Sequence, residues 1–240
     1  VSIALFANSS IKEMKPSNFL SYRSKVWQNT SRGGLPEIFL EDLNFEKYAD
    51  MFLNIPLLFI IQNSKHIKSD GKTFKDFMNG NIKAIENKKP TLKDFETHLS
   101  TIFTEIRLKS YIEIRSLDTC EWSCHCAGPA FYIGLLYGNL DEAYEVINKW
   151  NKLDVMNAYL EAPKKGLGTM INNKSILEWS EILLNLSKKG LQKRNVKNKS
   201  GEDESIFLKS IENTLSSKKT KAENTIEDFN EKKGIDFFYE

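Results

Sequence analysis

Residues 105–118 read EIRLKSYIEIRSLD, and their alternation indicates which kind of fold this chain adopts. Read with a period of two, the stretch has one apolar face and one charged face. The apolar face carries Ile106, Leu108, Ile112 and Ile114. The charged face carries Glu105, Arg107, Lys109, Tyr111, Glu113 and Arg115. Because β-branched isoleucine favours the pleated form, the pattern predicts a strand with one dry side and one charged side.

The charged face has two interpretations. In the first, one side of an antiparallel sheet faces solvent and opposite charges pair across its strands. In the second, the face is the floor of a cleft, where a carboxylate holds a divalent cation and a guanidinium holds phosphate oxygens. The i, i+2 spacing sets Glu113 beside Arg115 with roughly 6–7 Å between their backbones, which suits a metal and the phosphate that it bridges.

The composition limits the class of protein. A chain of 240 residues with 40% hydrophobic content buries a substantial core, so we expect one large domain or a domain with an appendage. Lys+Arg (34) nearly balance Asp+Glu (32), and the basic run at 188–199 has no interleaved aromatic residues. No apolar run approaches the ~20 residues of a membrane span. We therefore expect neither nucleic acid nor membrane as a partner.

The cysteines lie together in CEWSCHC, residues 120–126. Three thiols are an odd number with no distant partner, which argues against a disulfide framework and for a reducing compartment, the cytoplasm. With His125 they supply four zinc ligands, but adjacent residues on a short turn rarely converge tetrahedrally, and the second half-site is missing. Local packing with incidental thiols is the favoured interpretation.

The rest of the chain predicts helices, one further strand and a hairpin. Apolar residues recur at helical spacing in 19–27, 45–53, 73–78, 91–103 and 129–136. Residues 1–7 predict a buried strand, and 57–62 with 66–68 predict a hairpin. Helices are predicted at 141–164, 175–190, 202–215 and 222–232. Asp141 and Thr220 are their expected N-caps, and Gly190 is an expected helix stop.

Three side chains outside the central stretch are candidates for function. Arg23 falls among apolar neighbours, where it either extends its charged end past an apolar surface or clamps a carboxylate. Trp122 stands in the loop after the strand, as an aromatic lid or a buried anchor. His98 is expected to pack against the sheet, because a lone histidine needs a partner to be a catalyst.

Three motifs resemble glutamate–cysteine ligase family 2, the plant and bacterial type: SYIEIRSLD (110–118), PAFYIGLLYG (129–138) and LKDFETHLSTIFTEIRLK (92–109). The resemblance covers nearly the whole chain and implies the C-terminal portion of such a ligase. It implies ATP-dependent joining of the γ-carboxylate of L-glutamate to L-cysteine through γ-glutamyl phosphate, the first step of glutathione biosynthesis. The implied cofactors are ATP and Mg²⁺, and a homodimer is one option.

The same resemblance implies roles for five residues. Glu113 is a magnesium ligand, and Arg115 is the catalytic residue that contacts phosphate in the transition state. Arg107 and Arg115 bind the nucleotide. Arg23, in KPSNFLSYRS (15–24), matches the arginine that binds the glutamate α-carboxylate. Trp122 matches a tryptophan of the family and is assigned to the substrate.

The chain also departs from the family. Relatives tend to carry a tyrosine at Leu58, and plant relatives carry a regulatory cysteine pair at Ser69 and Ala84. The remaining metal-binding acids are implied to lie ahead of Val1, so we expect the isolated 240 residues to be inactive or nearly so. Two alternatives stay open: a non-catalytic or regulatory relative, and a γ-glutamyl ligase with another amine acceptor.

The expected fold class is α+β. Part of a curved antiparallel sheet, the glutamine synthetase-like cradle of the family, is backed by helices. We expect residues 1–138 to form the C-terminal part of the catalytic sheet with its packing helices, and residues 139–240 to form a helical region without candidate chemistry.

Overall fold

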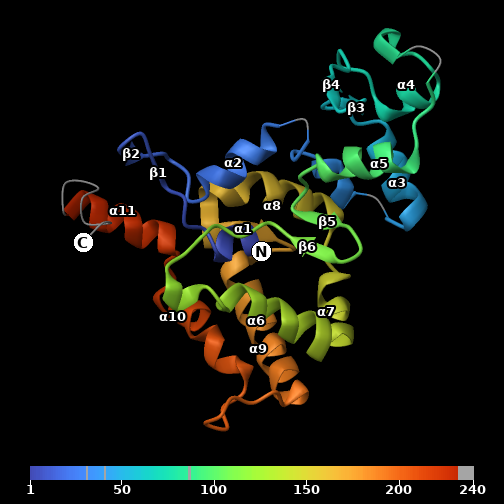
Figure 1. The fold of residues 1–240 in the computed structure, drawn as a ribbon. Coiled ribbons are helices and arrows are strands. Elements are labelled where there is room, and N and C mark those ends of the chain that lie inside the picture. The colour runs from blue at the N-terminus through green and yellow to red at the C-terminus, as the bar shows by residue number, and fades with distance from the viewer. Residues whose placement is uncertain (31, 41, 86–87, 232–240) are drawn as a thin grey trace. The chain divides into compact units, whose positions relative to one another are not determined.

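The computed structural model describes residues 1–231 except residues 31, 41, 86 and 87. The chain divides into two units, one made of Val1–Val26 with Ser116–Glu240 and the other of Trp27–Arg115. Both contain helices and paired strands (Figure 1), so the α+β class is confirmed. The curved sheet is not confirmed, because the described strands form separate two-stranded antiparallel sheets. The domain division at residues 138 and 139 stays a prediction.

The larger unit is mainly helical. Its α-helices are α1 (Ser2–Leu5), α2 (Tyr22–Gln28, ending in the other unit), α6 (Ala127–Ile133), α7 (Leu140–Ile147), α8 (Lys152–Lys165), α9 (Ile176–Arg194), α10 (Lys209–Ser217) and α11 (Lys221–Glu231). Short helices are η3 (Trp122–Cys124), the π-helix η4 (Gly134–Gly138), η5 (Gly166–Gly168) and η6 (Glu204–Leu208). Its strands are β1 (Ile11–Lys12), β2 (Lys15–Pro16), β7 (Met170–Ile171) and β8 (Lys174–Ser175).

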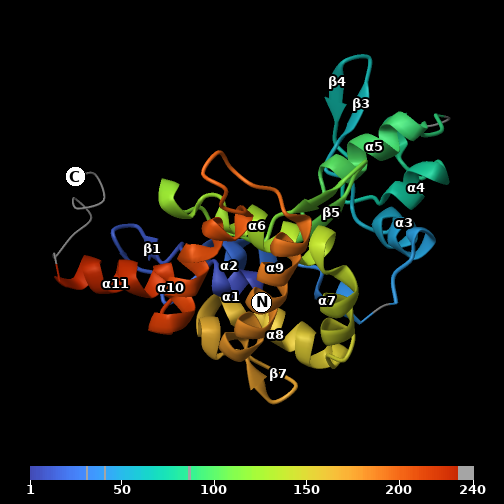
Figure 2. The ribbon, with the colours of Figure 1, turned by 90° about the horizontal axis from the view of Figure 1, so that it is seen from below.

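Close helix packing forms the core of this unit. Figures 1 and 2 both show α9 alongside α6, and α9 also packs against η4. Glycines permit this approach: the Cβ of an alanine at Gly138 would lie 2.2 Å from the carbonyl oxygen of Gly190. Gly190 is therefore an interior packing position, and its prediction as a helix stop is wrong. The helix continues to Arg194 and ends at Asn195, which is left-handed (φ 51°).

Two further predictions for this unit are wrong. The first residues form helix α1 and no strand, although Ile3, Ala4 and Leu5 are buried as expected. A short apolar run fits a buried strand and a buried helix equally well, so its period alone does not distinguish them. The prediction of Asp141 as an N-cap is also wrong. The N-cap of α7 is Asn139, which makes no side-chain cap bond because its side chain contacts α9 at Leu186 and Lys193.

The predicted N-cap Thr220 is confirmed, and a capping box of the same kind begins another helix. Thr91 and Asp94 form a capping box at the start of α5 (Leu92–Ser100), in the smaller unit. Thr220 caps α11, since its hydroxyl accepts from the backbone N–H of Glu223 and its own N–H donates to the Glu223 carboxylate. The predicted end of that helix, Lys232, lies outside the described residues. No described helix has both the length and the apolar character that a membrane crossing requires.

The smaller unit contains two hairpins and several short helices. Its helices are η1 (Pro36–Phe39), α3 (Phe45–Leu53), α4 (Phe74–Met78), η2 (Lys83–Ile85) and α5 (Leu92–Ser100). Its strands are β3 (Ile60–Gln62), β4 (Lys65–Ile67), β5 (Ile106–Leu108) and β6 (Ile112–Ile114). Figure 2 shows the β3–β4 hairpin extending beyond α5. His98 is buried inside this unit, so its packing role is confirmed, but its ring stacks on Phe74 of α4 at 5.4 Å and not on a sheet.

The stretch 105–118 is a hairpin and not a single strand. Strand β5 pairs with β6 in antiparallel register, with Arg107 opposite Glu113 and Leu108 opposite Ile112. The chain reverses at residues 109–111, where the N–H of Lys109 donates to the carbonyl oxygen of Tyr111. Fourteen residues exceed the usual length of about 3–10 for one strand, and Ser110 suits a turn. The grouping of residues into two faces is confirmed, because pairing joins apolar to apolar and Arg107 to Glu113. The prediction that the apolar face is dry is wrong, since Ile106 and Ile112 are exposed.

Candidate active site

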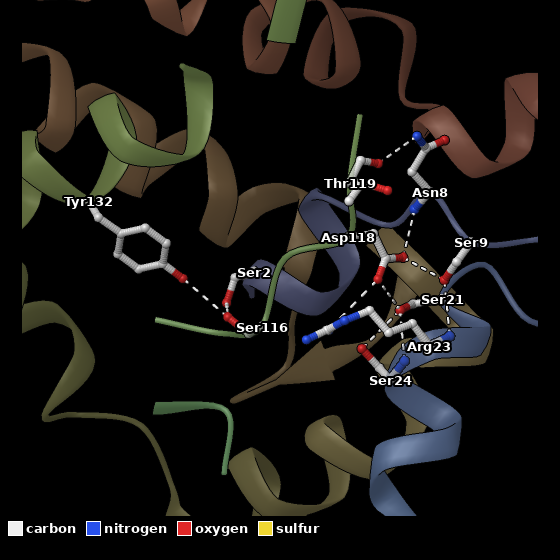
Figure 3. A network of polar contacts seen from close by, with 10 residues as sticks. All are labelled: Ser2, Asn8, Ser9, Ser21, Arg23, Ser24, Ser116, Asp118, Thr119 and Tyr132. Carbon is white, nitrogen blue, oxygen red and sulfur yellow. Dashed lines mark hydrogen bonds and ion pairs between the residues drawn. The ribbon is translucent and has the colours of Figure 1, made fainter. Parts of the chain in front are cut away.

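Asp118 is the centre of a polar network in the larger unit. Its carboxylate Oδ2 accepts hydrogen bonds from the Asn8 backbone N–H (2.9 Å) and the Ser9 hydroxyl (2.8 Å). Oδ1 accepts from the Ser21 hydroxyl (3.0 Å) and lies 3.9 Å from Nη1 of Arg23. Figure 3 shows these groups gathered around the carboxylate, whose side chain is only 2% exposed. We call these five residues the Asp118 network.

Short-range backbone pairing places the serines of this network. Ser9 and Ser21 form a parallel bridge, in which Ser9 N–H donates to Leu20 and Tyr22 N–H donates to Ser9. Ser21 is also the N-cap of α2, since its hydroxyl accepts from the Ser24 N–H at 3.2 Å. The segment after α1 and the start of α2 therefore meet at the Asp118 carboxylate.

Arg23 stands in the first turn of α2, and its side chain is 30% exposed. Its backbone N–H donates to the Ser9 hydroxyl at 3.0 Å. Of the two sequence interpretations, an arginine that only extends past apolar surface does not describe this residue, because its guanidinium faces the carboxylate of Asp118. Its binding of a substrate carboxylate stays a prediction.

Arg107, Glu113 and Arg115 form a second group, the hairpin cluster, in the smaller unit. Nε and Nη2 of Arg107 lie 2.7 and 2.6 Å from Oε2 of Glu113, and Nη1 of Arg115 lies 3.0 Å from Oε1. Nη1 of Arg107 also donates to the carbonyl oxygen of Ser100 at 2.8 Å. One carboxylate thus joins two guanidinium groups, each bound to its own oxygen.

An aromatic ring lies beside both arginines of the hairpin cluster. The guanidinium carbons of Arg115 and Arg107 lie 5.0 and 5.4 Å from the ring centre of Phe103. Trp27 is a second neighbour of Arg115, at 6.0 Å. Because cations are attracted to the faces of aromatic rings, these rings help to hold two positive charges close together.

Glu113 is ionised at neutral pH. Burial opposes its ionisation, but hydrogen bonds and charge from Arg107, followed by those from Arg115, outweigh burial and lower the pKa of the Glu113 carboxyl. The cluster therefore carries one negative and two positive charges. This net positive charge suits a place where anionic phosphate oxygens collect.

Glu113 fits Mg²⁺ as one ligand of a larger set. Protein sites usually hold Mg²⁺ through one or two carboxylates together with water and phosphate oxygens. Oε2 of Glu113 accepts from both Nε and Nη2 of Arg107, whereas Oε1 contacts Nη1 of Arg115 and keeps a second acceptor position. Among residues 1–231 as described, no group of three or more His, Cys, Asp or Glu is arranged to hold a metal. Glu113 alone would therefore supply only part of a magnesium shell.

Trp122 and the cysteines lie on the loop around η3. Trp122 is 90% exposed and stacks on His125, with ring centres 6.0 Å apart, so the buried-anchor interpretation is wrong. Its role as a lid stays a prediction. Cys120 and Cys124 form a disulfide, and Cys126 is exposed. The interpretation of these two cysteines as incidental thiols is wrong, because an irregular loop brings residues four positions apart to a Cα–Cα distance of 6.1 Å.

The predicted site residues fall into separate places. Arg107, Glu113 and Arg115 lie together in the hairpin cluster, Arg23 lies in the Asp118 network, and Trp122 lies on η3 outside that network. Asp118, the last residue of the stretch 105–118, is not among the site residues predicted from the sequence. The available signal was two serine-rich segments, residues 8–10 and 21–24, whose hydroxyls need an acceptor when buried.

Comparison with known proteins identifies the family of the chain. The family model described as Glutamate-cysteine ligase family 2 matches residues 1–234. A relative in Oryza sativa subsp. indica, "Glutamate--cysteine ligase A, chloroplastic", is 37% identical over 231 residues, covering 94% of this chain and 46% of the relative. "Glutamate--cysteine ligase, chloroplastic" of Solanum lycopersicum is 36% identical over 239 residues (98% and 45%). The Arabidopsis thaliana protein of that name is 35% identical over 235 residues (96% and 44%).

Two facts follow from these matches. The chain spans less than half the length of the curated relatives that it matches. The expectation of a cytoplasmic location is wrong, because these relatives are named chloroplastic enzymes and the thiol argument behind that expectation has lost its basis. Since the family match extends over residues 1–234 and the relatives are 35–37% identical, the chain belongs to glutamate–cysteine ligase family 2.

Proposed function

We propose that this chain carries part of the active site of an ATP-dependent ligase. The enzyme joins the γ-carboxylate of L-glutamate to the amino group of L-cysteine and so makes γ-glutamylcysteine, the first step of glutathione biosynthesis. The family and the names of the relatives support the reaction class. The observation that carries the proposal is the hairpin cluster, in which one ionised carboxylate joins two guanidinium groups.

The chemistry explains why such a cluster is useful. A carboxylate becomes electrophilic when ATP phosphorylates it, which gives γ-glutamyl phosphate, and the amine then displaces phosphate. The protein must stabilise the charge that the transferring phosphoryl group carries. Arg115 is the residue that contacts this group. Arg107 is more deeply buried and holds Glu113 in place while contributing positive charge toward the nucleotide.

Glu113 would be a ligand of Mg²⁺. When bound, Mg²⁺ neutralises phosphate charge and orients the phosphates for in-line attack. The contacts of Glu113 with Arg107 and Arg115 place a carboxylate and two cations within one hydrogen-bonded group, so the metal and the phosphates have adjacent binding groups. Arg23 binds the α-carboxylate of glutamate, and Trp122 covers the substrate as an aromatic lid.

The proposal includes polypeptide beyond these 240 residues. The described residues supply one carboxylate of the magnesium shell, and the relatives are more than twice as long as the matched region. We therefore propose that further metal-binding acids come from outside this sequence and that the isolated chain does not ligate. A single-turnover assay in which the isolated chain forms γ-glutamylcysteine would contradict this part.

The test is substitution in the intact protein that carries these residues. Glu113→Gln and Arg115→Ala are each expected to lower kcat for ATP-dependent ligation by about 100-fold or more, because each removes a group directed at phosphate charge. Glu113→Gln should also change the dependence of rate on Mg²⁺ concentration. Glu96→Gln, on an exposed helix surface, is the matched control and should leave both unchanged. Unchanged rate and magnesium dependence in Glu113→Gln would refute its assignment.

A further inference from the structure

We infer that Asp118 is a positioning residue that sets Arg23 for the substrate carboxylate. The inference rests on the proposed function of Arg23 and extends it to a residue that does not itself contact substrate. Asp118 is almost fully buried, and its carboxylate accepts three hydrogen bonds from two chain segments about 100 residues away in sequence. A buried carboxylate in that position orders the segments that it joins.

Asp118 holds Arg23 by two routes. The direct route is the ion pair between Oδ1 and Nη1 of Arg23, 3.9 Å apart. The second route passes through Ser9, whose hydroxyl donates to Oδ2 at 2.8 Å and accepts the backbone N–H of Arg23 at 3.0 Å. Figure 3 shows both routes ending on the same carboxylate. The backbone and the charged end of Arg23 are therefore both oriented by one group.

Ser21 adds a third constraint at the start of α2. Its hydroxyl donates to Oδ1 of Asp118 and accepts the N–H of Ser24, so the same carboxylate orients the N-cap of the helix that carries Arg23. A rotation of the first helical turn would break the bonds of Ser9 and Ser21 together. The direction of the Arg23 side chain is thereby coupled to Asp118.

The geometry orients Arg23 without a tight pairing. A bidentate arginine–carboxylate pair has distances of about 2.7–2.9 Å, shorter than the 3.9 Å found here. A carboxylate offers about four acceptor positions, and Asn8, Ser9 and Ser21 use three of them. Asp118 therefore acts on Arg23 mainly as a nearby negative charge. The side chain of Arg23 is 30% exposed, and its planar guanidinium fork has the geometry that binds a second carboxylate.

An aspartate is required in this position by the donors around it. The Asn8 N–H, the Ser9 hydroxyl and the Ser21 hydroxyl all donate toward Asp118. Asparagine would replace one acceptor oxygen by an NH₂ donor and would also remove the charge that faces Arg23. Asp118→Asn therefore keeps the shape of the side chain but changes one of its two terminal atoms from a hydrogen-bond acceptor to a donor.

The experiment is a double-mutant cycle in the intact protein. Asp118→Asn, Arg23→Ala and the double variant are compared for the KM of L-glutamate, the KM of ATP and kcat. Asp118→Asn alone should raise the KM of glutamate by about 10- to 100-fold, as a displaced binding group does, while the KM of ATP stays unchanged. In the Arg23→Ala background, Asp118→Asn should have no further effect on the KM of glutamate, because its target has been removed.

Two further variants address folding. Ser116→Ala lies in the same segment and contacts Ser2 and Tyr132, so it should leave the KM of glutamate unchanged. Ser9→Ala removes the hydroxyl that joins Asp118 to the backbone N–H of Arg23 and keeps the charge of Asp118. It should raise the KM of glutamate by several-fold, and it tests the inference even where Asp118→Asn does not fold. Thermal unfolding of each variant separates loss of structure from loss of substrate binding.

The outcomes distinguish the inference from the function on which it rests. If Arg23→Ala leaves the KM of glutamate unchanged, the proposed role of Arg23 fails and the inference fails with it. If Arg23→Ala raises that KM but Asp118→Asn and Ser9→Ala do not, Arg23 keeps its role and the positioning role of Asp118 is refuted. The same holds if Asp118→Asn raises KM equally in both backgrounds.

Discussion

Arg107 and Glu113 face each other across the β5–β6 hairpin, and the arginine is far more buried than the isoleucines on the other face. Arg107 is 8% exposed, whereas Ile106 and Ile112 are 54% and 60% exposed. The charged face of the hairpin is therefore the covered one in this chain. Burying a charged group costs free energy unless the group is paired, and the bonds from Arg107 to Glu113 and Ser100 supply that pairing.

Loss of the Arg107 guanidinium should destabilise the protein. Arg107→Gln leaves the Glu113 carboxylate and the Ser100 carbonyl without their strongest donor, and we expect the free energy of unfolding to fall by about 2 kcal/mol. Urea unfolding measures this. Ile112→Thr, on the exposed face of the same hairpin, should change it by less than about 0.5 kcal/mol. Equal losses in the two variants would contradict the finding that the charged face is buried and the isoleucine face is exposed.

Stability should depend on pH through His98. Burial lowers the pKa of the His98 imidazole below its ordinary 6.5, and its Nδ1 has no hydrogen-bond partner among the described residues. The unfolded chain therefore binds the proton first as pH falls. The free energy of unfolding should be unaffected by His98 above pH ~6.5 and should decrease below it, by up to about 1.4 kcal/mol per pH unit.

Denaturant unfolding at about pH 7.5, 6.5 and 5.5 measures this dependence. His98→Gln should remove most of the slope, because glutamine does not titrate. His66, on the exposed β4 strand, supplies the control, and His66→Gln should keep the slope of the parent protein. A slope that survives in His98→Gln would mean that another group causes it.

The contact between α9 and η4 should not accept an added methyl group. The Cβ of Gly190→Ala would lie 1.9 Å from the carbonyl oxygen of Gly134, which is backbone and does not yield easily. We expect a loss of about 3 kcal/mol or more in the free energy of unfolding. Gly168→Ala meets nothing within 4 Å and should stay within about 1 kcal/mol of the parent. Similar stability of the two variants would place the helices further apart than described.

The Cys120–Cys124 disulfide gives a fourth prediction. Peptide mapping under non-reducing conditions should find Cys120 linked to Cys124 and Cys126 alkylated. Because the closed loop is short, reduction should lower the free energy of unfolding by only about 2 kcal/mol. The double variant Cys120→Ser with Cys124→Ser should have the same stability with and without reductant. Cross-linking of Cys126 in the mapping experiment would contradict the pairing.

The sequence alone determined the local features of this protein. Capping boxes such as Thr91 with Asp94 depend on residues three positions apart, so they can be read without knowing the rest of the fold. The partition of residues 105–115 into two faces was also determined locally, since alternation fixes which side chains share a face. The placement of Glu113 beside Arg115 in one cluster followed from that spacing.

Only the tertiary structure decided which face is covered, where the strand reverses and which residues meet Asp118. A period of two assigns side chains to two faces but does not determine which face is buried. In this hairpin Arg107 is buried and Ile112 is exposed, so the charged face is the buried one. The Asp118 network joins segments whose positions differ by about 100 residues, and no local pattern encodes such an encounter. Contacts over that range depend on how helices and loops from distant parts of the sequence pack together, and interactions between neighbouring residues do not determine that packing.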